Sequence, residues 1–177
     1  MDNFNRANGA IGANWSGKTN GYSISSNQLS VGNGGDIYWS PGSFGANQEV
    51  YARLTNINQS ANEIDLLLKS QSRTSSSNGV LEIMYDPVGK RIQVWTYTKS
   101  QNWVQRGADI SVTLVNGDQL WAKASSTGIV SVYRNGILLA TRDVTAWPNY
   151  ASSGYIGVWF IKASPSTIDD FGGGTTP

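Results

Sequence analysis

The chain has 177 residues, of which 39% are hydrophobic and 14% charged, and its formal net charge is +1. This length fits one domain with a single core, and the near-neutral charge gives no electrostatic footprint for nucleic acid. Histidine and cysteine are both absent, which excludes disulfides, thiolate metal sites and catalytic triads that use histidine.

Short strands separated by turns are the regular elements that the sequence predicts. In chain order they lie near residues 22–30, 35–39, 48–55, 63–70, 80–85, 91–98, 110–114, 119–125, 129–134, 137–142 and 154–162. The clearest turn is Asn135-Gly136 between two β-rich runs, which is typical of a type I′ hairpin. Many short strands without helices predict an all-β fold, a β-sandwich or a jelly roll.

The domain organisation follows from the composition of the tail. We interpret residues 1–172 as a single β-sandwich domain and residues 173–177, at the end of a glycine-rich stretch, as the start of a linker. No apolar run approaches the roughly 18 residues that a membrane span requires. The sequence therefore indicates neither a membrane nor a nucleic-acid partner.

Alternation with a period of two separates two faces in four of these strands. One face is apolar and suits a sandwich core: Val50, Ala52, Leu54, Ile64, Leu66, Leu68, Ile92, Val94, Thr96, Leu120, Ala122 and Ala124. The other face mixes aromatic rings with charged and amide groups: Tyr51, Arg53, Asp65, Arg91, Gln93, Trp95, Tyr97, Trp121 and Lys123. Rings stack on the apolar face of a sugar while polar groups bind its hydroxyls, so we predict one contiguous carbohydrate-binding surface. The alternative is that these rings form cross-strand pairs or lie under a loop.

Tryptophans in loops form a second candidate set. Trp39, Trp103 and Trp147 lie in turn-rich segments, and exposed rings on loops often mark binding sites. The alternative is packing, with Trp147 closing one end of the sandwich. Trp15 and Trp159 lie in apolar, strand-like settings and are predicted to be core residues.

Several segments together resemble the concanavalin A-like lectin/glucanase superfamily, and most closely its laminin-G-like jelly-roll modules in secreted bacterial and phage proteins. They are the opening DNFNRANGAIGANW, the hairpin VYRNGILLA, the strand GYIGVWF and the closing IDDFGGG. The resemblance implies two antiparallel sheets, one of them concave, with the first and last strands paired. The Asp-Phe pairs at both chain ends would then meet, with each phenylalanine in the core.

The catalytic members of this superfamily that resemble family 16 glucanases carry a Glu-x-Asp-x-Glu strand. Here Glu63 and Asp65 match the first two acids, but Leu67 stands at the third position. Retaining glycosidases need two carboxylates about 5–5.5 Å apart, so catalysis would require Glu82 or Glu49 to substitute from a neighbouring strand. The sequence therefore favours a protein that is not an enzyme.

The function that we predict is a non-catalytic carbohydrate-binding module that recognises a neutral polysaccharide. It would be a monomeric, lectin-like module of a larger secreted, extracellular protein. Two alternatives remain: a structural or adhesion module of a phage fibre or surface protein, and, less favoured, a glycoside hydrolase of the glucanase type. An open groove favours sugar binding, whereas a face buried against a partner chain favours assembly.

The acidic chain ends suggest a structural calcium ion. Asp2, Asp169 and Asp170 would meet where the termini pair, followed by glycines able to present carbonyl oxygens, and calcium prefers such oxygen ligands. The alternative is that these acids cap turns or face solvent. Apart from this Ca²⁺, the sequence predicts no cofactor.

Overall fold

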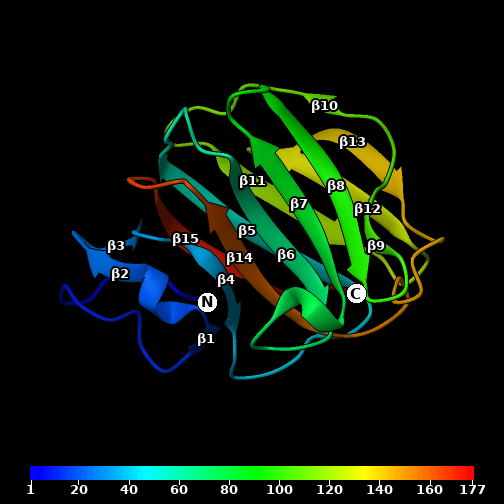
Figure 1. Cartoon of the computed structure of the whole chain (residues 1–177), viewed down its shortest axis with the longest axis horizontal. Helices are drawn as coiled ribbons and strands as arrows, with labels where there is room; N and C mark the ends of the chain where they lie inside the picture. Colours follow the sequence, from blue (N-terminus) through cyan, green and yellow to red (C-terminus); the bar gives the residue numbers. More distant parts are fainter.

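A computed structural model describes all 177 residues as a sandwich of two antiparallel β-sheets (Figure 1). The two helical segments, η1 (Thr19–Gly21) and η2 (Ser76–Asn78), are single 3₁₀ turns. No helix is long and apolar enough to cross a membrane. The predicted fold class, an all-β two-sheet antiparallel sandwich, is confirmed.

The sheet nearer the viewer in Figure 1 is called the front sheet, and the one behind it the back sheet. In spatial order the front sheet contains β1 (Trp15–Gly17), β4 (Gly35–Trp39), β14 (Tyr155–Ile161), β6 (Glu63–Ser70), β7 (Val80–Asp86), β8 (Arg91–Thr98) and β10 (Ile110–Ser111), with β9 (Asn102–Gln105) paired to β8. The back sheet contains β13 (Ile137–Asp143), β12 (Ile129–Arg134), β11 (Gln119–Ala124), β5 (Gln48–Asn56), β15 (Thr167–Thr175), β3 (Gln28–Val31) and β2 (Tyr22–Ser25).

The core lies between the sheets and is built from the apolar faces that alternation predicted. All twelve residues assigned to it in β5, β6, β8 and β11 are buried. Burying each large aliphatic side chain contributes about 1.5–3 kcal/mol. The period-two reading of these four strands is therefore confirmed.

Several strands differ from the prediction. Residues 22–30 form a hairpin, β2 and β3, whose turn residues Ser26 and Asn27 both have positive φ; the sequence lacks the glycine that usually marks such a turn. β1, β9 and β15 were not predicted as strands. β15 pairs with β5 as far as Thr175, so the strand includes residues that the sequence reading assigned to a linker. The Asn135-Gly136 turn has positive φ at both residues, as a type I′ hairpin requires.

The two chain ends meet, as the resemblance implied. The backbone N–H of Asp2 donates to the carbonyl of Phe171 at 3.0 Å. Phe4 and Phe171 are both buried, and their rings lie 6.1 and 4.8 Å from the ring of Trp15. The termini therefore form one aromatic cluster within the core.

Candidate functional site

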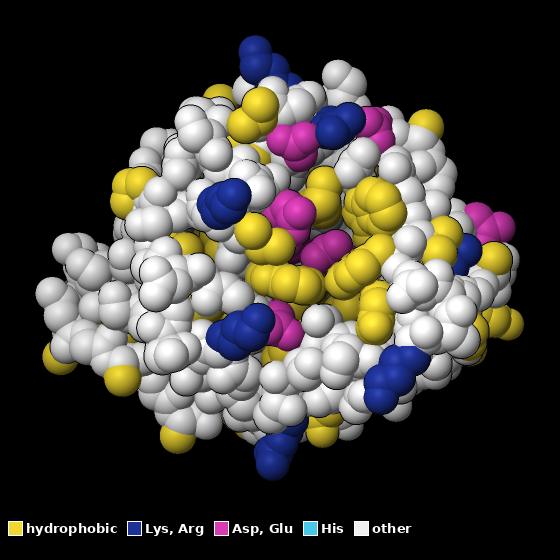
Figure 2. All heavy atoms as spheres, viewed as in Figure 1, with side chains coloured by type: hydrophobic (Ala, Val, Ile, Leu, Met, Phe, Trp, Pro, Cys, Tyr) yellow, Lys and Arg dark blue, Asp and Glu magenta, His cyan; other side chains and the backbone are white.

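The outer face of the front sheet is hollowed at its centre. Figure 2 shows hydrophobic and acidic side chains gathered in this hollow, with lysine and arginine side chains around it. The cavity has a volume of about 290 Å³ and is lined by Glu63, Glu82, Met84, Trp95, Trp103, Trp159 and Ile161. We call these residues, together with Asp65 beneath them, the groove. Its volume lies near the lower end of the range for small-molecule sites, about 300–1,000 Å³.

The antiparallel register places the groove residues in rows across four strands, because directly opposed residues share a face. In one row Trp159 of β14 lies opposite Asp65 of β6, which lies opposite Met84 of β7. In the next row Leu67 of β6 lies opposite Glu82, which lies opposite Trp95 of β8. Each row therefore places one acid between a tryptophan and an aliphatic side chain at the centre of the sheet.

Trp103 encloses the groove from above. It lies on the edge strand β9, and its ring centre is 5.1 Å from that of Tyr97 on β8 and 6.0 Å from that of Trp159 on β14. Since β6 and β7 separate β8 from β14 in the sheet, this ring reaches across the concave face. It remains 38% exposed and thus forms a wall accessible to solvent.

Three carboxyl groups form the floor of the groove, which we call the acidic floor: Glu63, Asp65 and Glu82. One oxygen of each lies within 4.8 Å of the others. Burial, reinforced by the Glu63 carboxylate, raises the pKa of Glu82 to about 8. Burial is the main cause that raises the pKa of Asp65 well above its usual value, and repulsion from Glu82 and Glu63 adds to it. Burial, together with repulsion from Asp86, also raises the pKa of Glu63. These shifts are those expected of like charges withdrawn from water.

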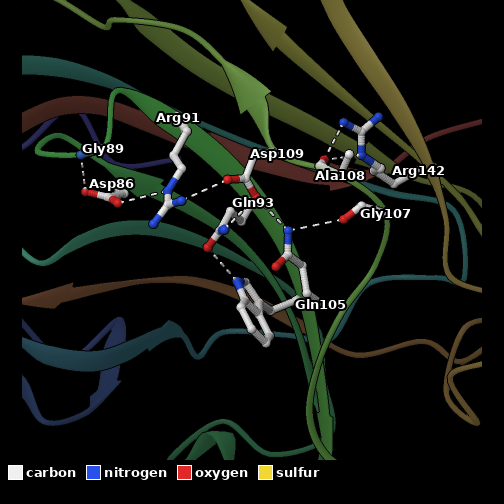
Figure 3. Close-up of polar contacts among 10 residues, drawn as sticks. Asp86, Gly89, Arg91, Gln93, Gln105, Gly107, Ala108, Asp109 and Arg142 are labelled. Atoms are coloured by element: carbon white, nitrogen blue, oxygen red, sulfur yellow. Dashed lines mark hydrogen bonds and ion pairs between the residues drawn. The ribbon is translucent and has the colours of Figure 1, made fainter.

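A polar network beside the groove fixes one of its walls (Figure 3). The Trp95 indole N–H donates to the side-chain oxygen of Gln93 (Oε1) at 3.1 Å, and the side-chain amide nitrogen of Gln93 donates to the Asp109 carboxylate at 2.6 Å. Asp109 also accepts from Gln105 at 2.7 Å and from Arg91 at 2.9 Å, and Arg91 donates to Asp86 at 3.0 Å. The polar groups of Arg91 and Gln93 therefore hold the Trp95 ring in place.

The nine residues predicted to form one surface lie on opposite sides of the molecule. Asp65, Arg91, Gln93, Trp95 and Tyr97 belong to β6 and β8 of the front sheet, whereas Tyr51, Arg53, Trp121 and Lys123 belong to β5 and β11 of the back sheet. The prediction of one contiguous surface is wrong, because alternation assigns a face within a strand but not the sheet that the strand joins. On the back sheet, Trp121 stacks on Tyr133 with ring centres 4.4 Å apart and lies under the Lys123 ammonium, which is the cross-strand alternative.

The loop tryptophans also separate. Trp103 lines the groove. Trp39 packs edge-on against Trp15, with ring centres 5.6 Å apart, on the core side of the front sheet. Trp147 is fully buried and donates its indole N–H to the carbonyl of Tyr97 at 3.0 Å, so its assignment to a ligand surface is wrong and the packing alternative holds.

Five residues that line the groove were absent from the predicted ligand-binding set: Glu63, Glu82, Met84, Trp159 and Ile161. Trp159, predicted to be in the core, faces the groove, whereas Trp15 is a core residue as predicted. Alternation in β14 contained the signal, because Ile156, Val158 and Phe160 form the core side and leave Trp159 outside. The same pattern in β7, with Leu81, Ile83 and Tyr85 inside, would have placed Glu82 on the outer face of its strand.

The predicted calcium ligands at the chain ends have other partners. The carboxylate of Asp2 accepts hydrogen bonds from the Phe4 N–H at 2.9 Å, from Trp15 Nε1 at 2.8 Å and from both terminal nitrogens of Arg6. The carboxylate of Asp169 accepts a hydrogen bond from the backbone N–H of Asp170 at 2.8 Å, and Asp170 is exposed. The acidic group whose carboxylates lie close enough together to hold a cation is instead the acidic floor of the groove.

The comparisons with known proteins concern the fold. No protein-family model and no curated protein sequence matches the chain. Among solved structures, the carbohydrate-binding module CBM66 from Bacillus subtilis is 12% identical, with a TM-score of 0.60 over 98% of this chain and 96% of that one. A non-specific endo-β-1,3(4)-glucanase of family GH16 is 14% identical, with a TM-score of 0.61 over 95% and 89%. The galectin LEC-6 of Caenorhabditis elegans is 12% identical, with a TM-score of 0.51 over 73% and 84%.

These neighbours define a class of antiparallel sandwiches that includes carbohydrate-binding modules, lectins and glucanases. The chain has the concanavalin A-like lectin/glucanase fold, which is the fold that the resemblance implied.

Proposed function

We propose that this protein binds carbohydrate in the groove of the front sheet, as a module of a larger extracellular protein. The observation that carries the proposal is the set of rings around one solvent-accessible cavity: Trp95, Trp103 and Trp159. Sugar rings stack on aromatic faces, and the adjacent carboxyl groups can bind hydroxyls. The fold is one that carbohydrate-binding modules and lectins share, and the open hollow in Figure 2 suits a ligand better than an assembly interface.

Affinity electrophoresis against a panel of polysaccharides tests this proposal. We expect retardation with a dissociation constant in the micromolar to millimolar range, which weak stacking contacts typically give. Neutral plant and algal polysaccharides belong in the panel, because the sequence predicted a neutral ligand. Absence of retardation across the panel, combined with self-association in light scattering, would favour the adhesion alternative.

A second candidate function is glycoside cleavage, and the position of Glu82 favours it. Leu67 replaces the third acid of the glucanase pattern, but Glu82 lies directly opposite Leu67 on β7. The three carboxylates approach within 4.8 Å, close to the roughly 5–5.5 Å spacing of retaining enzymes. Glu82, with its pKa raised to about 8, would be the protonated acid and Glu63 the nucleophile.

Release of reducing ends from β-glucans would test cleavage directly. Activity that is abolished in Glu63→Gln and in Glu82→Gln would establish the second function. Binding without release, at protein concentrations well above those used for glucanases, would leave the protein a binding module.

A further inference from the structure

The hydroxyls of a neutral sugar can bind the acidic floor, but they do not offset its concentration of carboxyl groups. Both carboxylate oxygens of Asp65 and one of Glu82 are buried without a hydrogen-bond partner. Asp65 is 1% exposed and Glu82 4%. None of the protein's six ion pairs includes a residue of the floor. Buried ionised carboxylates without partners are costly, so the partner has to be a shared proton, a water, an ion or a group of a bound ligand.

The charged groups around the floor already have partners. Asp86 on β7 and Arg91 on β8 pair with each other, and Arg91 also pairs with Asp109. On β4, Asp36 lies in the same row as Asp65 across Trp159, and it is 3.7 Å from the Lys18 ammonium. Lys69, also on β6, donates its ammonium to the backbone carbonyls of Ser125 and Tyr150 instead of to the floor. The strands that bear the floor thus direct no cation to it, and the missing positive charge has to come from the ligand or from bound protons.

The walls indicate which kind of cation would fit. Trp95, Trp103 and Trp159 present aromatic rings, and Met84 and Ile161 complete an apolar lining. Aromatic faces attract an organic ammonium group, whereas a calcium ion requires six to eight oxygen ligands. Ionised carboxylates accept hydrogen bonds from hydroxyls and from ammonium groups alike, but only the ammonium also supplies a positive charge, and charge-assisted hydrogen bonds are the stronger ones.

We propose that the groove selects saccharides with free amino groups, the ammonium lying on the acidic floor and the sugar ring against the tryptophans. The proposal rests on carbohydrate binding in the same groove and names the class of sugar. Because the floor carboxyls have raised pKa values, binding of an ammonium would displace protons, and affinity should rise as these carboxyls ionise.

Titration calorimetry with two matched ligands tests the proposal: a chito-oligosaccharide with free amino groups, and the same oligosaccharide after N-acetylation. The amine of the ligand has to be protonated for this comparison, so the titration is carried out below the pKa of that amine. We expect the free-amine ligand to bind about tenfold or more tightly than the acetylated one. The proton release that accompanies binding should appear as a dependence of the measured heat on the ionisation enthalpy of the buffer.

Two matched variants locate the effect. Glu82→Gln should weaken binding of the free-amine ligand about tenfold more than it weakens binding of the acetylated ligand, so that the preference for the free amine is largely lost. Glu49→Gln is the control, because Glu49 lies on β5 of the back sheet and pairs with Lys123, and it should not alter the preference.

The outcomes distinguish selection of amino sugars from carbohydrate binding in general. Equal affinity for both ligands, or preference for the acetylated or a neutral glucan ligand, would overturn amino-sugar selection and leave carbohydrate binding intact. Absence of binding by all of these saccharides would overturn both. Tight binding of Ca²⁺ alone that Glu82→Gln removes would identify the floor as a metal site and also overturn amino-sugar selection.

Discussion

Trp159 is the residue whose removal most directly tests where the ligand lies. It stands beside Asp65 on the front sheet and contacts Trp103 across the groove. Loss of one stacking ring typically costs about 1–3 kcal/mol, by analogy with bases stacked on aromatic side chains, so we expect Trp159→Ala to weaken saccharide binding roughly 5- to 150-fold. Affinity electrophoresis measures the change.

The matched control is Trp121→Ala, which removes a partly exposed ring from the outer face of the back sheet. It should leave binding unchanged, and circular dichroism should show both variants folded. If Trp121→Ala loses the ligand while Trp159→Ala keeps it, the binding surface lies on the back sheet and our assignment is wrong.

The buried carboxyl of Glu82 also predicts how stability depends on pH. Its folded-state pKa of about 8 lies above the ordinary value of 4.5, so the native state holds the proton longer than the unfolded state. The stability that the Glu82 carboxyl contributes is then fully present below about pH 4.5 and is lost as the pH rises toward 8. Glu82→Gln removes this loss.

Thermal unfolding at two pH values measures the effect. Near pH 8 we expect Glu82→Gln to be more stable than the wild type by about 1–3 kcal/mol, the usual penalty of an unsatisfied buried polar group, or roughly 2–12 °C. Near pH 4 the difference should almost vanish. A variant that is less stable at both pH values would mean that Glu82 has a stabilising partner.

At the scale of the strand, sequence alternation predicted side-chain faces correctly but not the sheets to which they belong. β5 and β8 both show a core face and an aromatic-polar face, yet one lies in the back sheet and the other in the front sheet. Sheet membership depends on pairing between residues far apart in the chain, such as Asp65 with Trp159, which a local period of two does not encode. The groove is therefore a product of topology, although its rings and acids were visible in the sequence.

The polar network beside β8 gives a prediction for this strand. Gln93→Met keeps the side-chain volume but removes the acceptor of the Trp95 indole and a donor to Asp109. With Trp95 free to reorient, we expect saccharide affinity to fall about 5- to 10-fold, corresponding to one hydrogen bond of about 1 kcal/mol. Near-ultraviolet circular dichroism should report the altered tryptophan environment.

Arg53→Met provides the matched comparison, since Arg53 lies on β5 of the back sheet and is exposed. It should change neither affinity nor the tryptophan signal. Unaltered affinity in Gln93→Met would mean that packing alone orients Trp95.

At the scale of the whole molecule, the chain ends close the sandwich. The sequence reading anticipated their meeting from the Asp-Phe pairs, but not the partners of Asp2, because Arg6 and Trp15 carry no pattern that marks them as its donors. Burial alone would raise the pKa of Asp2, but the hydrogen bonds from Arg6, Trp15 and the Phe4 N–H outweigh it and lower that pKa below 3.8. The stability that Asp2 contributes is thus present above pH 3.8 and lost as the pH falls through the lower folded-state pKa.

Replacement of Asp2 should therefore weaken the whole fold while the groove remains intact. Asp2→Ala leaves the Trp15 indole N–H and the Arg6 guanidinium without their acceptor, and a charged hydrogen bond contributes about 1.5–3 kcal/mol. We expect the melting temperature near pH 7 to fall by roughly 3–12 °C, with a smaller difference near pH 2. Asp170→Ala, at an exposed position of the same junction, should stay within about 0.5 kcal/mol of the wild type. If instead calcium raises the wild-type melting temperature and both variants abolish that rise, the junction is a calcium site and the Arg6–Asp2 pair is not its main stabilising contact.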